Sequence, residues 1–247
     1  MSFDQDALPA PLQVRLAVMP EVDCPYLPER RETVRGLMAS AIDGSTYQAF
    51  MDAGFRRSGR FIYQPVCRGC AECVPLRVPV SEFTPSTSQR RCSRRNQDLV
   101  VSISSPTLTD EKAALYRRYV QQWHHKSPSD ADDDTESLRA FLYDSPTDSL
   151  EFVYRDLSNR LLAVGLCDVT PNALSSVYFY FDPDDRQRSL GTFGALTEIE
   201  WCRRNARSYY YLGFLIKGCA AMNYKASYRP HELLGRDGNW QPTLSSS

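Results

Sequence analysis

The stretch LSSVYFYFDPDDRQRSLGTFGALTEIEWCRRNA, residues 174–206, joins an expected strand to an expected helix. Its first part, LSSVYFYFDP, is rich in aromatic side chains and ends at a proline, which is typical of a strand. Its last part, from residue 188 onward, spaces apolar side chains to form one stripe of an amphipathic helix, made by Phe193, Leu196, Ile199, Trp201 and Cys202.

The segments around this stretch extend the pattern. LEFVYRD (150–156) and LLAVGLCDVT (161–170) predict two strands before it, SYYYLGFLI (208–216) predicts a buried strand after it, and KGCAAMNYKA (217–226) a short helix. The order strand, strand, strand, helix, strand, helix is the plan of GNAT-type acyltransferases. We therefore expect an α/β (α+β) fold with a mostly antiparallel sheet.

The turn RSLGTFG has two readings. In a GNAT-type fold its backbone N–H groups approach a phosphate or carbonyl of the donor, which gives Gly191 a binding role. Alternatively, Gly191 and Gly194 only open the helix.

Composition describes an ordinary soluble protein. The chain has 247 residues, of which 42% are hydrophobic and 24% charged. No apolar run approaches the length of a membrane span, and the first residues lack a secretory signal, so we expect a cytoplasmic protein with no membrane contact. Its eight cysteines should then be reduced.

The first half predicts a smaller unit. It contains a capped helix at 45–55, a strand at 59–67, the proline-interrupted edge strand VPLRVPV (74–80) and a basic helix beginning near Ser86 or Ser88. The turn-rich segment SSPTLT, 104–109, suggests a boundary. We expect an N-terminal cysteine-containing domain over 1–104 and a GNAT-like domain over 105–247.

Positive charge gathers in one part of the chain. The net charge is −1, yet residues 54–95 hold nine arginines and two acids. Such a surface either binds a polyanion or is a solvated face that acids elsewhere balance. On a helix, four of these arginines would form one basic stripe suited to phosphates: Arg90, Arg91, Arg94 and Arg95.

Several separated phrases together resemble the arginyl-tRNA–protein transferase family, and the short length and CRGCAEC resemble its bacterial aspartate/glutamate leucyltransferase branch. The phrases are CPYLPER (24–30), GFRRSGRFIYQPVCRGCAECVPLRVPVSEFTPSTSQRR (54–91), SSVYFYFDP (175–183), SLGTFGALTEIEW (189–201) and YYYLGFLIKGCAAMNYKASYRPHELL (209–234). One departure is WHHKSPSDADDD (123–134), where Trp123 replaces the family's arginine and no glycine follows. His124 and His125 are therefore expected to be structural or surface residues.

The resemblance implies an enzyme that moves leucine from Leu-tRNA to the N-terminal α-amine of proteins starting with Asp or Glu. The new N-terminus marks them for N-degron degradation, and no CoA is involved. Three alternatives remain open: an arginyl donor, a CoA-dependent N-acetyltransferase of the same fold, and a non-catalytic metal-stabilised tRNA-binding module.

CRGCAEC, residues 67–73, spaces three thiols as C-x2-C-x2-C. A fourth ligand is absent nearby, and the resemblance supplies Cys24, with Cys92 as a fallback. Four thiolates suit zinc or an iron–sulfur cluster. Empty thiols or disulfides are the alternatives. The metal ligands predicted are Cys24, Cys67, Cys70 and Cys73.

The proposed reaction starts from an activated ester, so alignment of amine and ester supplies much of the acceleration. The acidic acceptor needs a nearby cation, for which we select Lys225 and Arg229, then Lys217. Asp182 or Glu198 could bind the amine or relay its proton. Tyr180 shares a strand face with Asp182 and is the third catalytic candidate.

Overall fold

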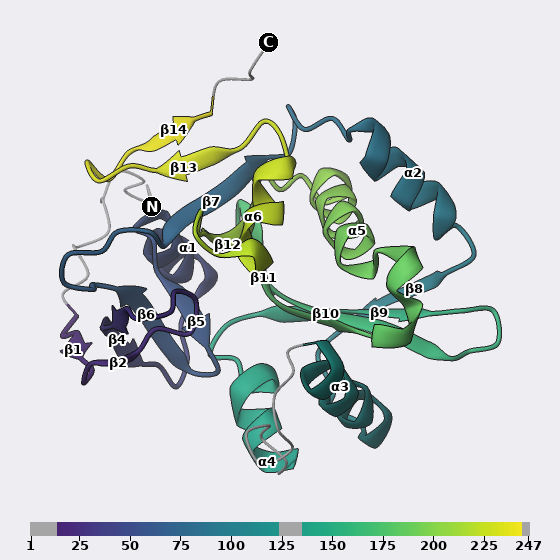
Figure 1. Cartoon of the computed structure of the whole chain (residues 1–247), viewed down its shortest axis with the longest axis horizontal. Coiled ribbons are helices and arrows are strands. Elements are labelled where there is room, and N and C mark those ends of the chain that lie inside the picture. The colour runs from purple at the N-terminus through teal and green to yellow at the C-terminus, as the bar shows by residue number, and fades with distance from the viewer. Residues whose placement is uncertain (1–13, 124–134, 244–247) are drawn as a thin grey trace, which may run out of the picture.

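The computed structural model describes residues 14–123 and 135–243, and an eight-stranded sheet runs through it (Figure 1). The strand order is β14-β13-β7-β12-β11-β10-β9-β8. The strands are β7 (Val74–Pro79), β8 (Val100–Ser104), β9 (Ser149–Arg155), β10 (Leu161–Val169), β11 (Ala173–Phe181), β12 (Tyr209–Leu215), β13 (Glu232–Leu234) and β14 (Trp240–Pro242).

Within the described part of this sheet, β11 and β12 form the parallel pair and the other neighbours are antiparallel. The meander β9-β10-β11, the helix after it and the returning strand β12 confirm the predicted order of elements. The α/β class with a mostly antiparallel sheet is therefore confirmed.

Helices cover both faces of the sheet (Figure 1). One face carries α5 (Leu190–Arg204), which contacts β11 and β12, and α2 (Thr87–Arg95), which packs on α5. The other face carries α3 (Asp110–Trp123), which contacts β10 and β11, and near it lies α4 (Thr135–Leu138) with the π-helical turn Arg139–Tyr143. The remaining helices are α1 (Gly44–Asp52) and α6 (Ala220–Asn223), with 3-10 segments at Pro183–Arg188 and Tyr224–Ser227.

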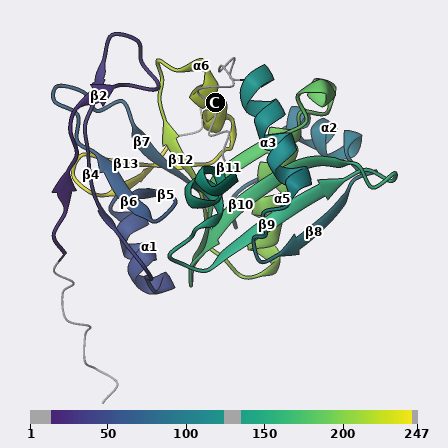
Figure 2. The ribbon, with the colours of Figure 1, turned by 90° about the horizontal axis from the view of Figure 1, so that it is seen from below.

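A second sheet lies beside the first (Figure 2). Its order is β1-β4-β6-β5, and a separate pair joins β2 to β3. The bounds are β1 (Ala17–Val18), β2 (Val22–Asp23), β3 (Arg31–Glu32), β4 (Val34–Met38), β5 (Arg56–Ser58) and β6 (Phe61–Pro65).

Apolar packing joins these layers. One cluster lies between the large sheet and α5, and includes Phe152, Tyr154 and Ile199. Another lies under α3. A third surrounds α1 and joins Ile62 of the small sheet to Tyr211 of the large one. Burial of these side chains stabilises the fold by roughly 25 cal/mol per Å² of apolar area removed from water.

The two sheets are also joined by a buried ion pair. Arg57 of β5 donates to both carboxylate oxygens of Asp168 of β10, each at 2.6 Å. Ser149 donates to the same carboxylate at 2.8 Å. A bidentate pair with a further donor is the arrangement that a buried carboxylate requires.

The expected edge position of VPLRVPV is wrong. β7 lies inside the sheet, between β12 and β13. Its prolines remove N–H groups at Pro75 and Pro79, but β13 pairs only with Leu76 and Arg77, which lie between them. Because β13 is short and pairs only between the two prolines, β7 can lie inside the sheet although Pro75 and Pro79 have no N–H group to donate.

The predicted boundary between 104 and 105 stays a prediction. Strands from both sides of it share the large sheet, since β7 and β8 precede it in sequence. His124 and His125 lie outside the described residues. Among the described helices, none combines the length and apolar character that crossing a bilayer requires.

Candidate active site between strands β11 and β12

The parallel pairing of β11 with β12 is short. It joins Ala173–Ser175 to Tyr209–Tyr211, and β11 then continues to Phe181 without further pairing to β12. Gly213 has φ +82° and lies at a register shift of β12 against β7. The two strands therefore part at the centre of the large sheet, next to Ser176 and Gly213.

Two buried cations lie where the strands part. Arg56 of β5 donates from Nη1 to Ser175 Oγ at 2.8 Å and from Nη2 to the Ser176 carbonyl. Lys225 donates from Nζ to the Phe214 carbonyl at 2.9 Å. Burial and, to a smaller extent, the nearby charge of Arg56 lower the pKa of Lys225 to about 7.

Phenols and a thiol surround these cations. Tyr26 and Tyr63 both interact electrostatically with Arg56, and Cys73 interacts with Lys225. Burial raises the pKa of both phenols, so they are neutral hydrogen-bond donors. Tyr26 also lies within electrostatic range of Tyr178 on β11.

Glu198 of α5 approaches β11 from the opposite face. Its carboxylate accepts a 2.5 Å hydrogen bond from the Tyr210 hydroxyl. Burial raises the pKa of Glu198 to about 7 against the opposing effects of the Tyr210 hydrogen bond and of the nearby Cys167 and Ser176 side chains. Glu198 Oε1 is a buried oxygen without a hydrogen-bond partner among the described residues, but Ser176 lies close enough to affect the Glu198 pKa while its carbonyl accepts from Arg56. A carboxyl group that titrates near neutrality can accept or release a proton under working conditions.

The other two catalytic candidates, Asp182 and Tyr180, are hydrogen-bonded to other side chains of the protein. Asp182 is buried and accepts from Arg118 at 2.8 Å and Arg160 at 3.1 Å, and it caps the 3-10 segment through the Asp184 N–H. The Tyr180 hydroxyl lies 2.7 Å from that of Tyr143 in the core under α3. A catalytic role for either residue stays a prediction.

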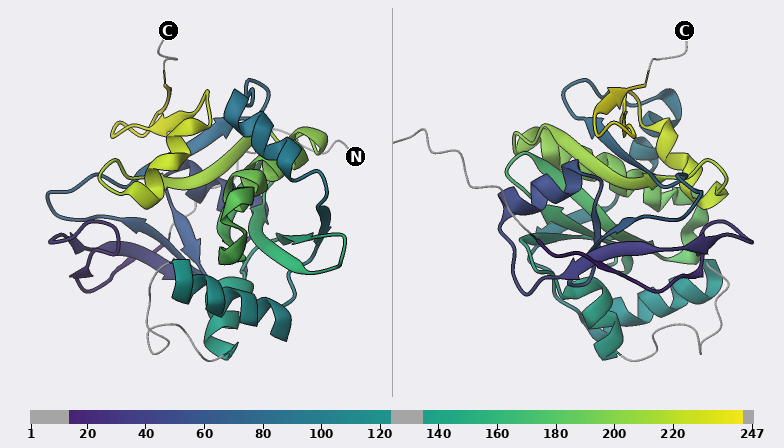
Figure 3. Two further views of the ribbon diagram at one scale, coloured as in Figure 1. Left: turned by 45° about the vertical axis from the view of Figure 1, so that its right-hand side comes forward. Right: turned by 90° about the vertical axis from the view of Figure 1, so that its left-hand side faces the viewer.

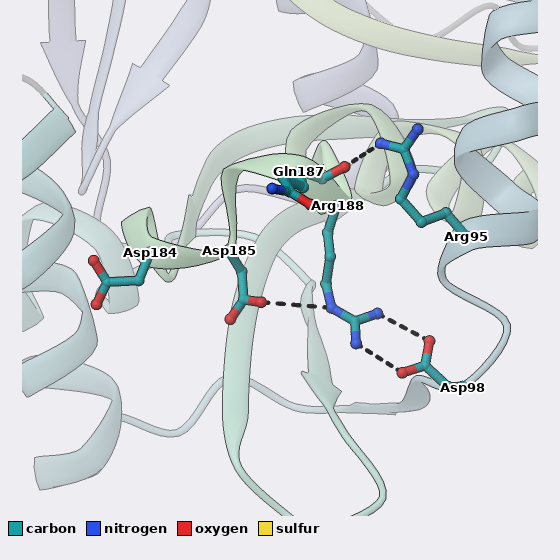
Figure 4. A pocket seen from close by; sticks show the side chains of 6 residues that line it. All are labelled: Arg95, Asp98, Asp184, Asp185, Gln187 and Arg188. Carbon is teal, nitrogen blue, oxygen red and sulfur yellow. Dashed lines mark hydrogen bonds and ion pairs between the residues drawn. The ribbon is translucent and has the colours of Figure 1, made fainter.

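The start of α5 borders the basic helix α2 (Figure 3). Arg95 donates to the Gln187 carbonyl, and Asn96 donates to the Arg188 carbonyl at 2.8 Å. Beside this contact is a polar pocket of about 420 Å³ lined by Arg95, Asp98, Asp184, Asp185, Gln187 and Arg188 (Figure 4). Arg188 and Asp98 form an ion pair across it.

Gly191 and Gly194 differ in what surrounds them. A Cβ at Gly194 would collide with the Phe179 ring, so packing alone requires that glycine. A Cβ at Gly191 would meet nothing within 4 Å. No packing contact therefore explains Gly191, and its predicted role in donor binding stays open.

The four predicted tRNA-binding arginines are all exposed on α2. Ser86 caps this helix, and Gln89 completes a capping box. Arg90 bonds the Pro85 carbonyl at 2.6 Å, whereas Arg91 and Arg94 have no ion-pair partner among the described residues. Their charges are therefore available to a ligand. In contrast, Arg57 and Arg77 of the same basic stretch are paired with carboxylates inside the protein.

The other predicted acceptor residues, Arg229 and Lys217, are exposed. Lys225 is the candidate that the structure brings to the gap between β11 and β12. Sequence reasoning missed Arg56, because its neighbour Arg57 is of the same type and burial cannot be read from composition. The available signal was the position of the pair at the start of a strand, directly after the helix that closes at Gly54.

The predicted cysteine ligands come from two loops. Cys67 accepts from the Thr33 N–H at 3.4 Å, and the Cys70 N–H donates to the Cys67 carbonyl at 3.3 Å. Burial, with smaller contributions from Cys67, Cys24 and Cys70, raises the pKa of Cys73 to about 12. The four thiols are therefore close enough to interact.

All eight cysteines are free thiols. Across residues 14–123 and 135–243, no three potential ligand side chains are arranged to hold a metal ion. The donor types, four thiols, fit zinc or an iron–sulfur cluster. A metal at this cluster stays a prediction.

Two family descriptions and a solved structure resemble this chain. The family description "Arginine-tRNA-protein transferase, N terminus" matches residues 22–91, and "Arginine-tRNA-protein transferase, C terminus" matches 111–235. The C-terminal domain of a putative lysylphosphatidylglycerol synthetase from Agrobacterium fabrum is a solved structure with a TM-score of 0.49 and 15% identity, over 82% of this chain and 64% of that one.

Two curated relatives cover most of the chain. An aspartate/glutamate leucyltransferase of Saccharophagus degradans is 40% identical over an alignment of 216 residues that covers 85% of this chain and 89% of that protein. One of Pseudomonas syringae pv. tomato is 42% identical over 217 residues, with the same coverage. Because the two family regions together match most of the chain and these relatives share 40–42% identity with it over 85% of its length, this chain belongs to the arginine-tRNA-protein transferase family.

Proposed function

We propose that this protein is an aminoacyltransferase that moves leucine from Leu-tRNA to the N-terminal α-amine of proteins beginning with Asp or Glu. The observation that carries the proposal is the 40–42% identity, over 85% of the chain, to curated aspartate/glutamate leucyltransferases. The new N-terminal leucine would mark the acceptor for N-degron degradation. Because aminoacyl-tRNA is the donor, we propose the cytoplasm as the place of action.

The reaction is a transfer from an ester to an amine. The neutral α-amine attacks the carbonyl carbon of the leucyl ester, the C–O bond to the tRNA ribose breaks, and the ribose oxygen takes the proton that the amine loses. An α-amino group has a pKa of about 7.7–8.0, so a useful fraction is neutral near pH 7. Holding amine and ester together therefore accounts for much of the rate.

The gap between β11 and β12 offers groups for the acceptor. Arg56 and Lys225 supply positive charge there. Glu198 supplies a carboxyl group that titrates near pH 7 behind Ser176, and because its side chain is fully buried it would relay a proton through a neighbouring group such as Tyr210, whose hydroxyl donates to it.

The tRNA would lie across α2 and the first turn of α5. The exposed guanidinium groups of Arg91 and Arg94 face no carboxylate among the described residues, and phosphate contacts of this kind position nucleic acid without reading its sequence. The open surroundings of Gly191 leave room for the donor at the start of α5.

We further propose that the four cysteines bind zinc or an iron–sulfur cluster. When bound, the group would supply cross-links between the loop at Cys24 and the loop from Cys67 to Cys73. Cys73 lies within electrostatic range of Lys225, so these cross-links would also hold in place the loop that borders Lys225. A direct check is metal content by elemental analysis of protein purified without oxygen, compared with its Cys70→Ser variant.

A transfer assay tests the proposed function. Purified protein is mixed with radiolabelled Leu-tRNA or Arg-tRNA and with a peptide starting in Asp, against a matched peptide starting in Ser. Label from leucine on the Asp peptide alone is the expected result. Label from arginine would overturn the donor, and acetylation with acetyl-CoA would favour an N-acetyltransferase. No transfer from either tRNA, with tRNA binding retained, would indicate a binding module.

A further inference from the structure

Buried cations in this protein are normally paired with a carboxylate. Arg57 has Asp168, and Lys112 has Glu151 at 2.5 Å. Arg56 and Lys225 are buried to a similar degree, with 9% and 7% of their surfaces exposed, yet neither has an ion-pair partner among the described residues. An uncompensated buried charge is costly, and this cost is why the pKa of Lys225 is lowered to about 7; a carboxylate beside the two side chains would remove it.

The two charges converge on one place. A Cβ at Gly213 would lie 3.6 Å from Nε of Arg56 and 3.6 Å from Nζ of Lys225. The cationic groups therefore lie within twice that distance of each other, beside the backbone of β12. Their protein partners are Ser175 Oγ, backbone carbonyls and the Met222 sulfur, none of which carries a negative charge.

The surroundings do not neutralise the pair. Tyr26 and Tyr63 interact with Arg56 as neutral phenols, and Cys73 and Cys219 interact with Lys225. Glu32 lies within electrostatic range of both phenols but forms no ion pair with either cation. The guanidinium also retains N–H donors beyond the two that its neighbours use.

We infer that Arg56 and Lys225 together form the subsite for the side-chain carboxylate of the acceptor's first residue. The identity of that acceptor rests on the proposed function. A carboxylate placed between the two would receive charge-assisted hydrogen bonds from both and complete an ion pair that the fold leaves open. Asn or Gln would offer the same cations a neutral carbonyl oxygen in place of a carboxylate, so the subsite disfavours them.

Binding of acceptor peptide in the absence of tRNA tests this subsite directly. Two dye-labelled peptides, identical except for Asp or Asn at the first position, are titrated with the full-length protein and followed by fluorescence anisotropy. We expect the Asp peptide to bind roughly 10- to 100-fold more tightly, which is the range for losing one hydrogen bond to a charged group. Equal affinity for the two peptides would overturn the inference.

Lys225→Met is the principal variant, because methionine preserves length and needs no hydrogen-bond partner when buried. It should reduce the Asp preference at least about tenfold while its far-UV circular dichroism matches the wild type. Arg56→Met should do the same, and Arg56→Lys should restore part of the preference. Since Arg56 also holds β11, the folded Lys225→Met protein keeps the test valid if Arg56→Met does not fold.

Arg236→Met is the matched control, since it removes an exposed positive charge from the turn between β13 and β14. Its Asp preference should equal that of the wild type. In the transfer assay, loss at the subsite should raise KM for the Asp peptide more than it lowers kcat. An unchanged Asp preference in Lys225→Met would overturn the inference, even if the wild-type protein transfers leucine. If Lys225→Met loses Asp binding but the wild-type protein transfers no leucine, only the proposed donor is overturned.

Discussion

Glu198 shows how one buried group couples stability to pH. Burial raises its pKa to about 7 in the folded protein, above the ordinary value of 4.5. Between these values the folded state binds the extra proton, so stability is lost as pH rises from about 4.5 to 7, by up to about 1.4 kcal/mol per pH unit. Above pH 7 the contribution is constant.

The variant Glu198→Gln should remove this dependence. Relative to that of the wild type, its free energy of unfolding should become larger as pH rises from 5 to 7, and then level off. Urea unfolding of both proteins at pH 5, 6, 7 and 8 measures the difference, in which the titration of other groups cancels. A difference that stays constant over this range would show that Glu198 is already ionised in the folded protein.

Arg57 and Asp168 give a prediction of a different kind. Asp168→Asn leaves the buried Arg57 guanidinium without its negative partner, so we expect a loss of about 3–5 kcal/mol in the free energy of unfolding. The control is Glu200→Gln, where the half-exposed ion pairs with Arg203 and Arg204 should contribute at most about 1 kcal/mol. Comparable losses in the two variants would contradict this account of the pair.

At single positions, the sequence indicates which side chains could take part in the chemistry but does not show what surrounds them. A cation for the acceptor was expected at Lys225, and the structure brings Lys225 to the gap between β11 and β12. The same reasoning gave no means to separate Arg56 from Arg57, which are adjacent but have different partners in the fold. The sequence offers Asp182 as a free carboxylate for catalysis, yet its carboxylate accepts hydrogen bonds from Arg118 and Arg160, which lie far from it along the chain.

At the scale of elements, α2 carries the prediction about tRNA. Arg91→Glu with Arg94→Glu should weaken tRNA binding, because both side chains are exposed and lack an internal carboxylate partner in the described part of the chain. For each phosphate that the variant no longer neutralises, the slope of log affinity against log salt should also become shallower by about 0.7–0.9.

The helix itself should survive these substitutions. Its cap at Ser86 and its buried residues Gln89 and Cys92 are untouched. Filter binding at several salt concentrations measures the effect, with Arg236→Glu as the control for loss of a surface charge elsewhere. Affinity unchanged at low salt would exclude α2 from the tRNA-binding surface.

Elements were predictable where local pattern and final environment agree. The meander, α5 and α2 follow from periodicity and from caps such as Ser86. The position of β7 was not predictable in this way, because its prolines indicate an edge. The pairing with β13 is restricted to Leu76 and Arg77, and β13 comes from far along the sequence. Only the tertiary arrangement shows that the prolines are tolerated there.

At the scale of the whole molecule, the two predicted domains share their principal sheet. β7 lies between β12 and β13, and β8 forms the end of the sheet beside β9. Separating the chain after residue 104 would expose the edges of β12 and β9 and the apolar cluster behind them. The buried pair Arg57–Asp168 would be divided as well.

We therefore expect the chain to unfold in one cooperative transition, although its length would allow two domains. Tryptophan fluorescence and far-UV circular dichroism should give coincident urea curves, because Trp240 packs on Tyr211 near the small sheet while Trp201 contacts Phe152 beneath α5. A chain beginning at residue 105 should fail to reach native-like circular dichroism. Two separated transitions, or a folded 105–247 fragment, would instead establish the boundary at 104 as a folding boundary, and the shared strands would then be a docked interface between independent units.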